Sequence, residues 1–318
     1  MSTIAVRVAR KTREAEAICS YELVRVDGAA LPPFEAGAHI DVHLPNGLVR
    51  QYSLCNAPGE TQRYLIAVLR DAGSRGGSRA MHDEVDAGAV LAISEPKNHF
   101  ALLEAGRTLL LAGGIGVTPI LAMAEALATR GAPFEMHYCA RSPERAAFRE
   151  RIGAASFAGQ VRFHYDSGDA AQRLDLASLL AGPESGAHLY VCGPQGFIDH
   201  VLDSAKALGW PSAQLHVEYF GAAPLDTSGD QPFDVKLASS GKVVSVPVGQ
   251  SVVKALAAQG VEIPYSCEEG VCGTCLTRVL AGVPDHRDLY LTDEERAAND
   301  QFTPCCSRAR TPLLVLDL

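Results

Sequence analysis

The length, composition and charge of this 318-residue chain exclude several classes of protein. With 47% hydrophobic and 20% charged residues it has the composition of a globular protein, and it is long enough for two or three domains. The net charge of −9 argues against nucleic acid or an anionic membrane as the main partner, and no apolar run approaches membrane-spanning length. We therefore expect a multidomain protein that binds neither nucleic acid nor membrane.

The N-terminal segment alternates short apolar runs with turn residues. Runs such as HIDVHL, RQYSL, RYLIAVLR and AVLAISEP are separated by Pro, Gly and Asn in stretches such as LPNG and NAPGE. This rhythm is typical of an antiparallel β-barrel. We predict such a barrel for residues 1–105.

In the middle segment, residues 106–224, strand-like and helical stretches alternate. The apolar runs TLLLAGG, FEMHYCA, VRFHY and HLYVCGP are interleaved with the helical stretches TPILAMAEALATRG and PQGFIDHVLDSAKALG. Strand and helix in turn predict an α/β domain with a parallel sheet. The stretch AAPLDTSGDQP, residues 222–232, then has the composition of a linker. Residues 232–318 form a third predicted domain, with two strand candidates and a short helix, SVVKALAAQG.

A glycine-rich turn follows the first strand of the middle segment. In LLLAGGIGVTPI the strand leads into Gly113, Gly114 and Gly116, and we expect a helix with Thr118 as its N-cap and Pro119 as its first residue. Glycines there would let the pyrophosphate of a dinucleotide approach the backbone, and the helix N-terminus would attract it. A purely structural tight turn is the alternative.

Two other strand ends of this segment carry information. The fourth strand ends in Cys192, Gly193 and Pro194, at the carboxyl edge where ligands of such sheets bind, although a buried cysteine before an ordinary turn is equally compatible. The second strand is followed by Arg141 instead of the ribose-binding acid expected there, which disfavours a simple dehydrogenase fold. An arginine at that place would favour NADPH, because it could pair with a 2′-phosphate.

Cysteines cluster near the C-terminus. Cys267, Cys272 and Cys275 have the spacing C-x4-C-x2-C, and Cys305 and Cys306 follow about thirty residues later. Four thiolates in this arrangement hold a 2Fe-2S cluster in plant-type ferredoxins.

Other uses of these thiols are less compatible with the pattern. Gly270 and Gly273 would let the backbone curl tightly around a cluster. Adjacent cysteines are a poor chelating pair for zinc. A disulfide framework is disfavoured by the odd count of nine cysteines and by the lack of a signal-like segment after Met1. We therefore expect a reducing, cytoplasmic compartment.

Several motifs, in this order along the chain, resemble those of phthalate dioxygenase reductase and its relatives. They are RQYSLCNAP, SRGGS, GGIGVTP, CGP, HVEYFGA and the terminal cysteine pattern. The resemblance spans essentially the whole chain. It implies an FMN-binding barrel, an NADH-binding domain and a plant-type ferredoxin domain of β-grasp fold. It also implies that the chain supplies electrons to a terminal oxygenase of Rieske type that acts on an aromatic substrate such as phthalate or vanillate.

The same resemblance assigns roles to residues. Arg50 would neutralise the FMN phosphate, while Tyr52 and Ser53 would offer a ring face and a hydroxyl to the flavin. The nicotinamide would lie near Cys192 and Thr118. The choice of FMN over FAD and the choice of NADH rest on the resemblance alone. The resemblance further implies a phosphate-binding loop of Arg75, Gly76, Gly77 and Ser78. It places Phe220 near the flavin, with Glu218 close by. It also implies that Cys305 is the fourth cluster ligand.

Other functions remain open at this point. NADH delivers two electrons as hydride and a 2Fe-2S cluster takes one at a time, so a flavin between them would split the pair. A haem monooxygenase could replace the Rieske partner without changing any cofactor. The chain could also reduce free flavin or ferric chelates, or be a zinc-stabilised protein that senses nucleotides.

Overall fold

The computed structural model describes residues 3–169, 172–222 and 225–318. The chain divides into two compact units, Met1–Glu218 and Tyr219–Leu318. Among the residues described, none of the helices has the length and apolar character needed to cross a bilayer.

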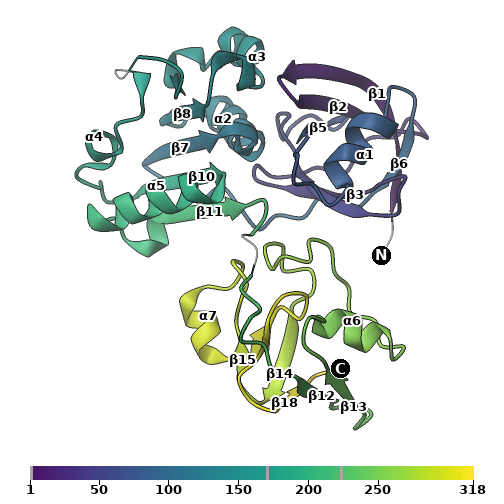
Figure 1. Cartoon of the computed structure of the whole chain (residues 1–318). Helices are drawn as coiled ribbons and strands as arrows, with labels where there is room; N and C mark the ends of the chain where they lie inside the picture. Colours follow the sequence, from purple (N-terminus) through teal and green to yellow (C-terminus); the bar gives the residue numbers. More distant parts are fainter. Residues whose placement is uncertain (1–2, 170–171, 223–224) are drawn as a thin grey trace. The chain divides into compact units, whose positions relative to one another are not determined.

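The first unit begins with a six-stranded antiparallel sheet in the order β4-β3-β6-β1-β2-β5 (Figure 1). A bridge between Leu54, just after β4, and Ile66 in β5 joins the two edges, so the sheet curls into a barrel. Inward-facing side chains such as Val6, Val8 and Ile40 are fully buried. The predicted antiparallel barrel is confirmed. Its elements are β1 Ile4–Ala15, β2 Ile18–Arg25, β3 His39–His43, β4 Val49–Ser53, β5 Tyr64–Leu69, α1 Gly77–Glu84 and β6 Val90–Ile93.

A five-stranded sheet, in the order β11-β10-β7-β8-β9, forms the rest of the first unit. The pairs β10–β7, β7–β8 and β8–β9 are parallel, which confirms the predicted fold class. Helices lie on both faces of the sheet, with α2 on one and α5 on the other (Figure 1). The elements are β7 Arg107–Gly113, η1 Gly114–Gly116, α2 Val117–Arg130, β8 Phe134–Ala140, η2 Pro143–Arg145, α3 Arg149–Ala154, η3 Ala158–Gln160, β9 Val161–Tyr165, α4 Leu176–Leu180, β10 Ala187–Gly193, α5 Gln195–Ala207, η5 Ser212–Gln214 and β11 Leu215–Tyr219.

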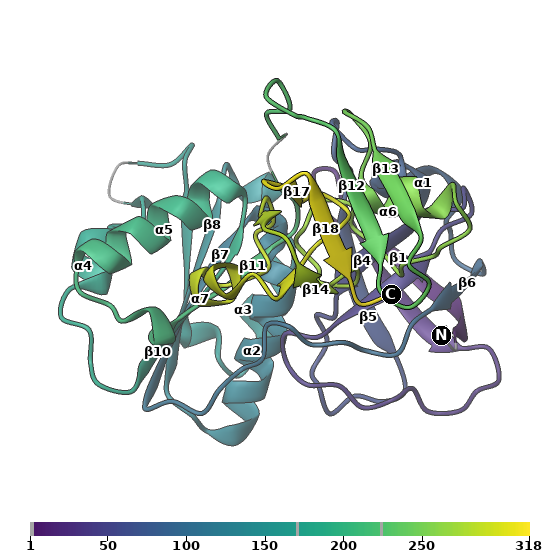
Figure 2. The ribbon, with the colours of Figure 1, turned by 90° about the horizontal axis from the view of Figure 1, so that it is seen from below.

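The second unit contains a mixed sheet in the order β13-β12-β18-β14-β16 and a small pair, β15 and β17. Figure 2 shows β12, β13 and β18 side by side. This α+β arrangement has more strands than the two expected from the sequence, because the extra ones are only two to five residues long and lack a periodic pattern. The elements are β12 Phe233–Leu237, β13 Val243–Val246, α6 Val252–Ala257, β14 Thr277–Ala281, β15 Pro284–Asp285, α7 Asp293–Ala298, β16 Gln301–Phe302, β17 Arg308–Ala309 and β18 Leu313–Leu316.

Two glycines of the barrel predict a contrast in stability. Gly37 and Gly47 both have a positive φ, of 92° and 79°. A Cβ atom at Gly37 would stand 1.9 Å from the carbonyl oxygen of Phe100, whereas one at Gly47 would meet nothing within 4 Å. We expect Gly47→Ala to lower the free energy of unfolding by about 1 kcal/mol and Gly37→Ala by about 1–3 kcal/mol more. Urea unfolding of both variants checks this, and equal losses would contradict it.

Candidate functional site

On the barrel, Arg50 lies against the start of helix α1. A Cβ atom at Gly77 would stand 2.6 Å from Arg50 Cγ and 2.7 Å from its Nε, so only glycine leaves room for the arginine. The helix follows Gly76, which has a φ of 100°, and no side chain caps the N–H groups of its first turn. A guanidinium beside an uncapped helix N-terminus is suited to bind a phosphate.

The loop before α1 is held by its own polar side chains. Ser78 Oγ accepts a hydrogen bond from the Asp71 N–H at 3.2 Å, and Ser74 Oγ accepts one from the Gly76 N–H at 3.2 Å. Arg75 lies between these turns. Since Ser78 Oγ acts as an acceptor here, its hydroxyl proton remains available for another group. The predicted phosphate-loop residues therefore lie together with Arg50 at one end of the helix.

Strand β4 carries the two other predicted flavin contacts, Tyr52 and Ser53. Tyr52 is partly buried, and desolvation raises the pKa of its phenol. Ser53 is buried, and its hydroxyl donates a hydrogen bond to Glu218 Oε2 at 3.2 Å. Because Glu218 belongs to β11, this bond ties the barrel to the parallel sheet.

Glu218 has an unusual electrostatic environment. The residue as a whole is only partly buried, but desolvation of its carboxyl raises the pKa to about 8, and the hydrogen bond from Ser53 offsets part of that rise. Burial also raises the pKa of the Cys192 thiol, and the nearby Glu218 adds to that rise. Strand β4 and the ends of β10 and β11 thus bring Ser53, Cys192 and Glu218 together.

From the sequence, Glu218 is expected only to lie close to Phe220, with no role of its own. Its residue type and its position in HVEYFGA do not distinguish it from a solvent-facing strand residue. The enclosure of its carboxyl comes from a barrel strand 165 residues earlier in the chain. No local pattern carries that information.

The two predicted nucleotide-binding turns pack backbone against backbone. A Cβ atom at Gly116 would stand 2.2 Å from the carbonyl oxygen of Cys192, and one at Gly193 would stand 2.9 Å from Gly113 Cα. At Gly113 a Cβ atom would approach Pro194 Cδ to 3.0 Å. Glycine is therefore required at these positions by the close approach of β7 and β10 at their carboxyl ends.

The predicted cap of helix α2 was wrong. The helix begins at Val117 with Gly116 in the N-cap position, so Thr118 is its second residue and Pro119 its third. Thr118 Oγ1 donates to the Ile115 carbonyl at 3.1 Å and does not cap. The reason is the 3₁₀ turn η1, which leads directly into α2 and starts the helix earlier. Proline is tolerated in the first turn because the N–H groups there have no partner within the helix.

Two further predicted positions are exposed. Phe220 follows β11 and is 42% exposed. Arg141 follows β8, and its carbonyl accepts a hydrogen bond from the Ser167 N–H at 3.0 Å. The Asp166 N–H donates to the Ala140 carbonyl at 3.1 Å. An acidic residue at the end of β9 thus neighbours Arg141 at the end of β8.

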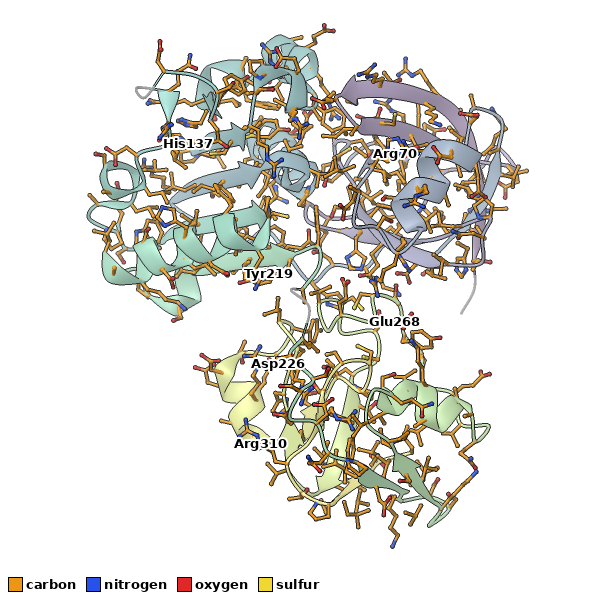
Figure 3. The ribbon with its side chains drawn as sticks, in the orientation of Figure 1. Arg70, His137, Tyr219, Asp226, Glu268 and Arg310 are labelled. Carbon is orange, nitrogen blue, oxygen red and sulfur yellow. The ribbon has the colours of Figure 1, made fainter. Side chains whose placement is uncertain are left out.

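In the second unit, the predicted cluster loop is built from left-handed turns. Glu268, labelled in Figure 3, Gly270 and Gly273 have φ values of 58°, 72° and 67°. A Cβ atom at Gly270 would stand 2.8 Å from Asp288 Cα, and one at Gly273 would stand 2.2 Å from Tyr290 Cζ. Both glycines are therefore required by conformation and by space.

Hydrogen bonds converge on the first sulfur of this loop. The Glu269 N–H donates to Cys267 Sγ at 3.4 Å. Hydrogen bonds from the Cys272 and Cys305 thiols lower the pKa of Cys267, and backbone N–H groups contribute. Donors directed at a sulfur stabilise its thiolate, which is the form that binds iron.

Both adjacent cysteines lie near the loop, since a Cβ atom at Gly270 would stand 2.5 Å from Cys306 Sγ, but Cys305 is the one that hydrogen-bonds to the other cysteine thiols. It is 7% exposed, and hydrogen bonds with Cys267 and Cys275 raise the pKa of its thiol. Cys306 Sγ lies 3.3 Å from Thr303 Oγ1 and 3.8 Å from Ser307 Oγ. The structure therefore brings Cys267, Cys272, Cys275 and Cys305 together.

Backbone features of the cluster loop suit a 2Fe-2S cluster. These features are its left-handed turns and its N–H donors to sulfur. A 2Fe-2S cluster distributes four thiolates over two irons. In the described part of the chain, no three or more His, Cys, Asp or Glu side chains are arranged to hold one metal ion.

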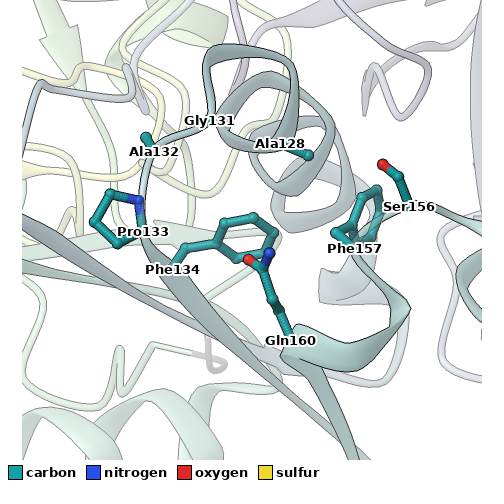
Figure 4. Close-up of a pocket in the computed structure, with 8 residues that line it drawn as sticks. All are labelled: Ala128, Gly131, Ala132, Pro133, Phe134, Ser156, Phe157 and Gln160. Atoms are coloured by element: carbon teal, nitrogen blue, oxygen red, sulfur yellow. The ribbon is translucent and has the colours of Figure 1, made fainter.

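An open pocket of about 560 Å³ lies elsewhere, at the end of α2 and the start of β8 (Figure 4). Phe134 begins β8, so this pocket is at the amino edge of the sheet, opposite the glycine turns. It contains no charged side chain. Its lining residues are Ala128, Gly131, Ala132, Pro133, Phe134, Ser156, Phe157 and Gln160.

Comparison with known families matches two parts of the chain. Residues 235–310, which include all four predicted cluster cysteines, match the 2Fe-2S iron-sulfur cluster binding domain. Residues 95–215 match the N-terminal domain of dimethylamine monooxygenase subunit DmmA-like proteins. The first match supports the 2Fe-2S cluster predicted from cysteine spacing.

Whole-length relatives show the family. The vanillate O-demethylase oxidoreductase of Pseudomonas putida is 59% identical, over 98% of each chain. The solved phthalate dioxygenase reductase, described as a modular structure for electron transfer from pyridine nucleotides to [2Fe-2S], is 40% identical with a TM-score of 0.77, over 100% of this chain and 98% of that one. An intact type IV self-sufficient cytochrome P450 monooxygenase is 41% identical with a TM-score of 0.87, over 99% of this chain and 41% of that one. The chain therefore belongs to the family of phthalate dioxygenase reductase and vanillate O-demethylase oxidoreductase, and it is a flavin and 2Fe-2S oxidoreductase that acts as the reductase component of an oxygenase.

Proposed function

We propose that this reductase takes electrons from NADH through FMN and a 2Fe-2S cluster and delivers them singly to a Rieske-type oxygenase that demethylates vanillate. The observation that carries the proposal is the meeting of Ser53, Cys192 and Glu218, because it joins a flavin-type barrel to the ligand-binding edge of a parallel sheet. The choice of vanillate rests on the 59% identity to a vanillate O-demethylase oxidoreductase.

FMN would bind along β4 and the start of α1. Arg50 would pair with the phosphate, together with Arg75 and the N–H groups of residues 76–78. Tyr52 and Ser53 would contact the ring system. The position of Arg50 against Gly77 supports this assignment, since it directs a guanidinium to an uncapped helix N-terminus.

NADH would bind at the carboxyl edge of the sheet. The turn formed by Gly113, Gly114 and Gly116 would admit the pyrophosphate, with Thr118 and Pro119 in the helix turn that follows. The nicotinamide would lie against Cys192, Gly193 and Pro194, with Phe220 on the flavin. The choice of NADH over NADPH rests on the family resemblance, because Asp166 and Arg141 are neighbours at this edge and would act on a 2′-phosphate in opposite directions.

The cofactors supply the redox chemistry: bound FMN can accept the two electrons of a hydride and release them one at a time to the cluster. The protein contributes orientation and the local electrostatic environment. Ser53 and Glu218 would exclude water where the two rings meet, and we infer that Glu218 is protonated at neutral pH. No general acid or base is needed for the hydride itself.

The cluster would be held by Cys267, Cys272, Cys275 and Cys305. The corresponding domains are residues 1–105 for FMN, 106–224 for NADH and 232–318 for the cluster. Free thiols and a cluster that needs reduced cysteines suit a reducing, cytoplasmic compartment.

A haem monooxygenase is the second candidate partner. This second candidate is supported by the match of nearly the whole chain to a segment that makes up 41% of a self-sufficient cytochrome P450 monooxygenase. The cofactors of the reductase would be the same with either partner. Only the oxygenase that receives the electrons differs between the two proposals.

Mixing experiments distinguish these partners. We expect the protein with NADH to support vanillate demethylation by a purified Rieske-type oxygenase component, with formaldehyde released in step with NADH consumption. A matched reaction contains a cytochrome P450 without its own reductase domain. Turnover only in the second reaction would reverse the choice of partner, and turnover in neither would contradict the proposal.

The two adjacent cysteines give a matched pair of variants. We expect Cys305→Ser to abolish the reduced-cluster electron paramagnetic resonance signal and to slow cytochrome c reduction more than tenfold, while NADH still bleaches the flavin. Cys306→Ser should keep both properties, because its sulfur faces Thr303 and Ser307. The reverse pattern would assign Cys306 as the ligand.

Glu218 predicts a pH dependence of stability. The folded protein holds this proton up to about pH 8, whereas the unfolded chain releases it near pH 4.5. The free energy of unfolding should therefore fall as pH rises between these values, by at most about 1.4 kcal/mol per pH unit from this group, and level off above them.

Glu218→Gln removes that ionisation. We expect a flatter dependence for this variant in urea unfolding at pH 5.5, 7.0 and 8.5, whereas the exposed Glu104→Gln should follow the unchanged protein. Parallel curves for Glu218→Gln and the unchanged protein would mean that the carboxyl ionises normally.

A further inference from the structure

Glu268 adopts a backbone conformation that side chains rarely take. Its φ is 58°, and the other left-handed residues of the cluster loop are glycines. Glycine at this position would avoid the steric cost. Backbone outliers of this kind persist where the surrounding structure holds them, which suggests that the Glu268 side chain has a role.

The conformation of Glu268 directs a donor at a cluster cysteine. Glu268 lies between Cys267 and Glu269, and its left-handed turn folds the Glu269 N–H back onto Cys267 Sγ at 3.4 Å. The Val271 N–H also contributes at this sulfur. A change in the Glu268 backbone would therefore move a donor away from the first sulfur of the loop.

Lys254 holds the side chain of Glu268. Lys254 Nζ lies 2.8 Å from Glu268 Oε2, and 30% of the glutamate side chain is exposed. Lys254 belongs to α6, which is anchored by the buried Val252, Val253 and Leu256. The ion pair thus connects a fixed helix to the cluster loop.

The same helix also contacts the distal ligand segment. The Val253 N–H donates to the Pro304 carbonyl at 3.3 Å, and Pro304 directly precedes Cys305. Ser251 Oγ accepts from the Lys254 N–H at 3.3 Å and starts the helix at this point. The first turn of α6 therefore contacts both chain segments that supply the cysteines.

We propose that Lys254 is a positioning residue whose ion pair with Glu268 fixes the Cys267 turn and offsets the effect of the Glu268 charge on the reduction potential of the cluster. The proposal rests on the four cysteines being the cluster ligands. Reduction adds a negative charge to the cluster, so the Glu268 carboxylate opposes it and the Lys254 ammonium favours it. The pair keeps these two effects nearly balanced.

Charge variants test this through the sign of the shift. In a redox titration followed by electron paramagnetic resonance, Lys254→Met should make the potential more negative and Glu268→Gln less negative. Each should change the equilibrium constant for reduction by about threefold, and the double variant should lie close to the unchanged protein. Loss of the cluster to a chelator should be about threefold faster in both single variants, since the turn is less constrained.

Lys236→Met, on β12, is the matched control, because it removes an equal charge from an exposed strand residue of the same unit. It should shift the potential less than half as much as Lys254→Met. Single-variant shifts in the same direction, or shifts no larger than that of Lys236→Met, would overturn the proposal. If the unchanged protein held no cluster, the assignment of the four cysteines as ligands would fail. That failure can be told apart from failure of the Lys254 proposal, because it is seen in the unchanged protein before any substitution is made.

Discussion

The hydrogen bond from Ser53 to Glu218 is the interaction on which the account of the first unit depends. Ser53 ends a strand of the antiparallel barrel and Glu218 lies at the end of a strand of the parallel sheet, so the bond joins two separately built layers. Desolvation there raises the pKa of the Glu218 carboxyl to about 8. A water-poor junction between a barrel and the ligand-binding edge of a sheet is what hydride transfer between two flat rings requires.

The rest of this site follows from the close approach of main chains. Glycines at the ends of β7 and β10 let the turn after β7 contact the Cys192 carbonyl directly. In the second unit, the loop with Gly270 and Gly273 also depends on close approach, because side chains at these positions would collide with Asp288 or Tyr290. In both places two stretches of chain approach so closely that only glycine fits.

Much of the fold and the cluster site could be predicted from the sequence, because both depend on local sequence patterns. Alternating runs predicted the barrel, strand and helix in turn predicted the parallel sheet, and the spacing of Cys267, Cys272 and Cys275 predicted the cluster that the family comparison supports. The predicted cap of α2 was wrong, since the 3₁₀ turn η1 leads directly into the helix and starts it earlier than a cap at Thr118 would. The environment of Glu218 could not be predicted, because it depends on contact with a strand 165 residues away.

The central claim is that one chain connects a two-electron donor to a one-electron carrier. An anaerobic titration with NADH, followed by visible absorption and electron paramagnetic resonance, tests it most directly by counting electrons. The account predicts complete reduction after about one and a half equivalents of NADH per chain, two electrons on the flavin and one on the cluster, with a rhombic 2Fe-2S signal. An end point at one equivalent without that signal, or a protein that takes up no electrons from NADH, would contradict it.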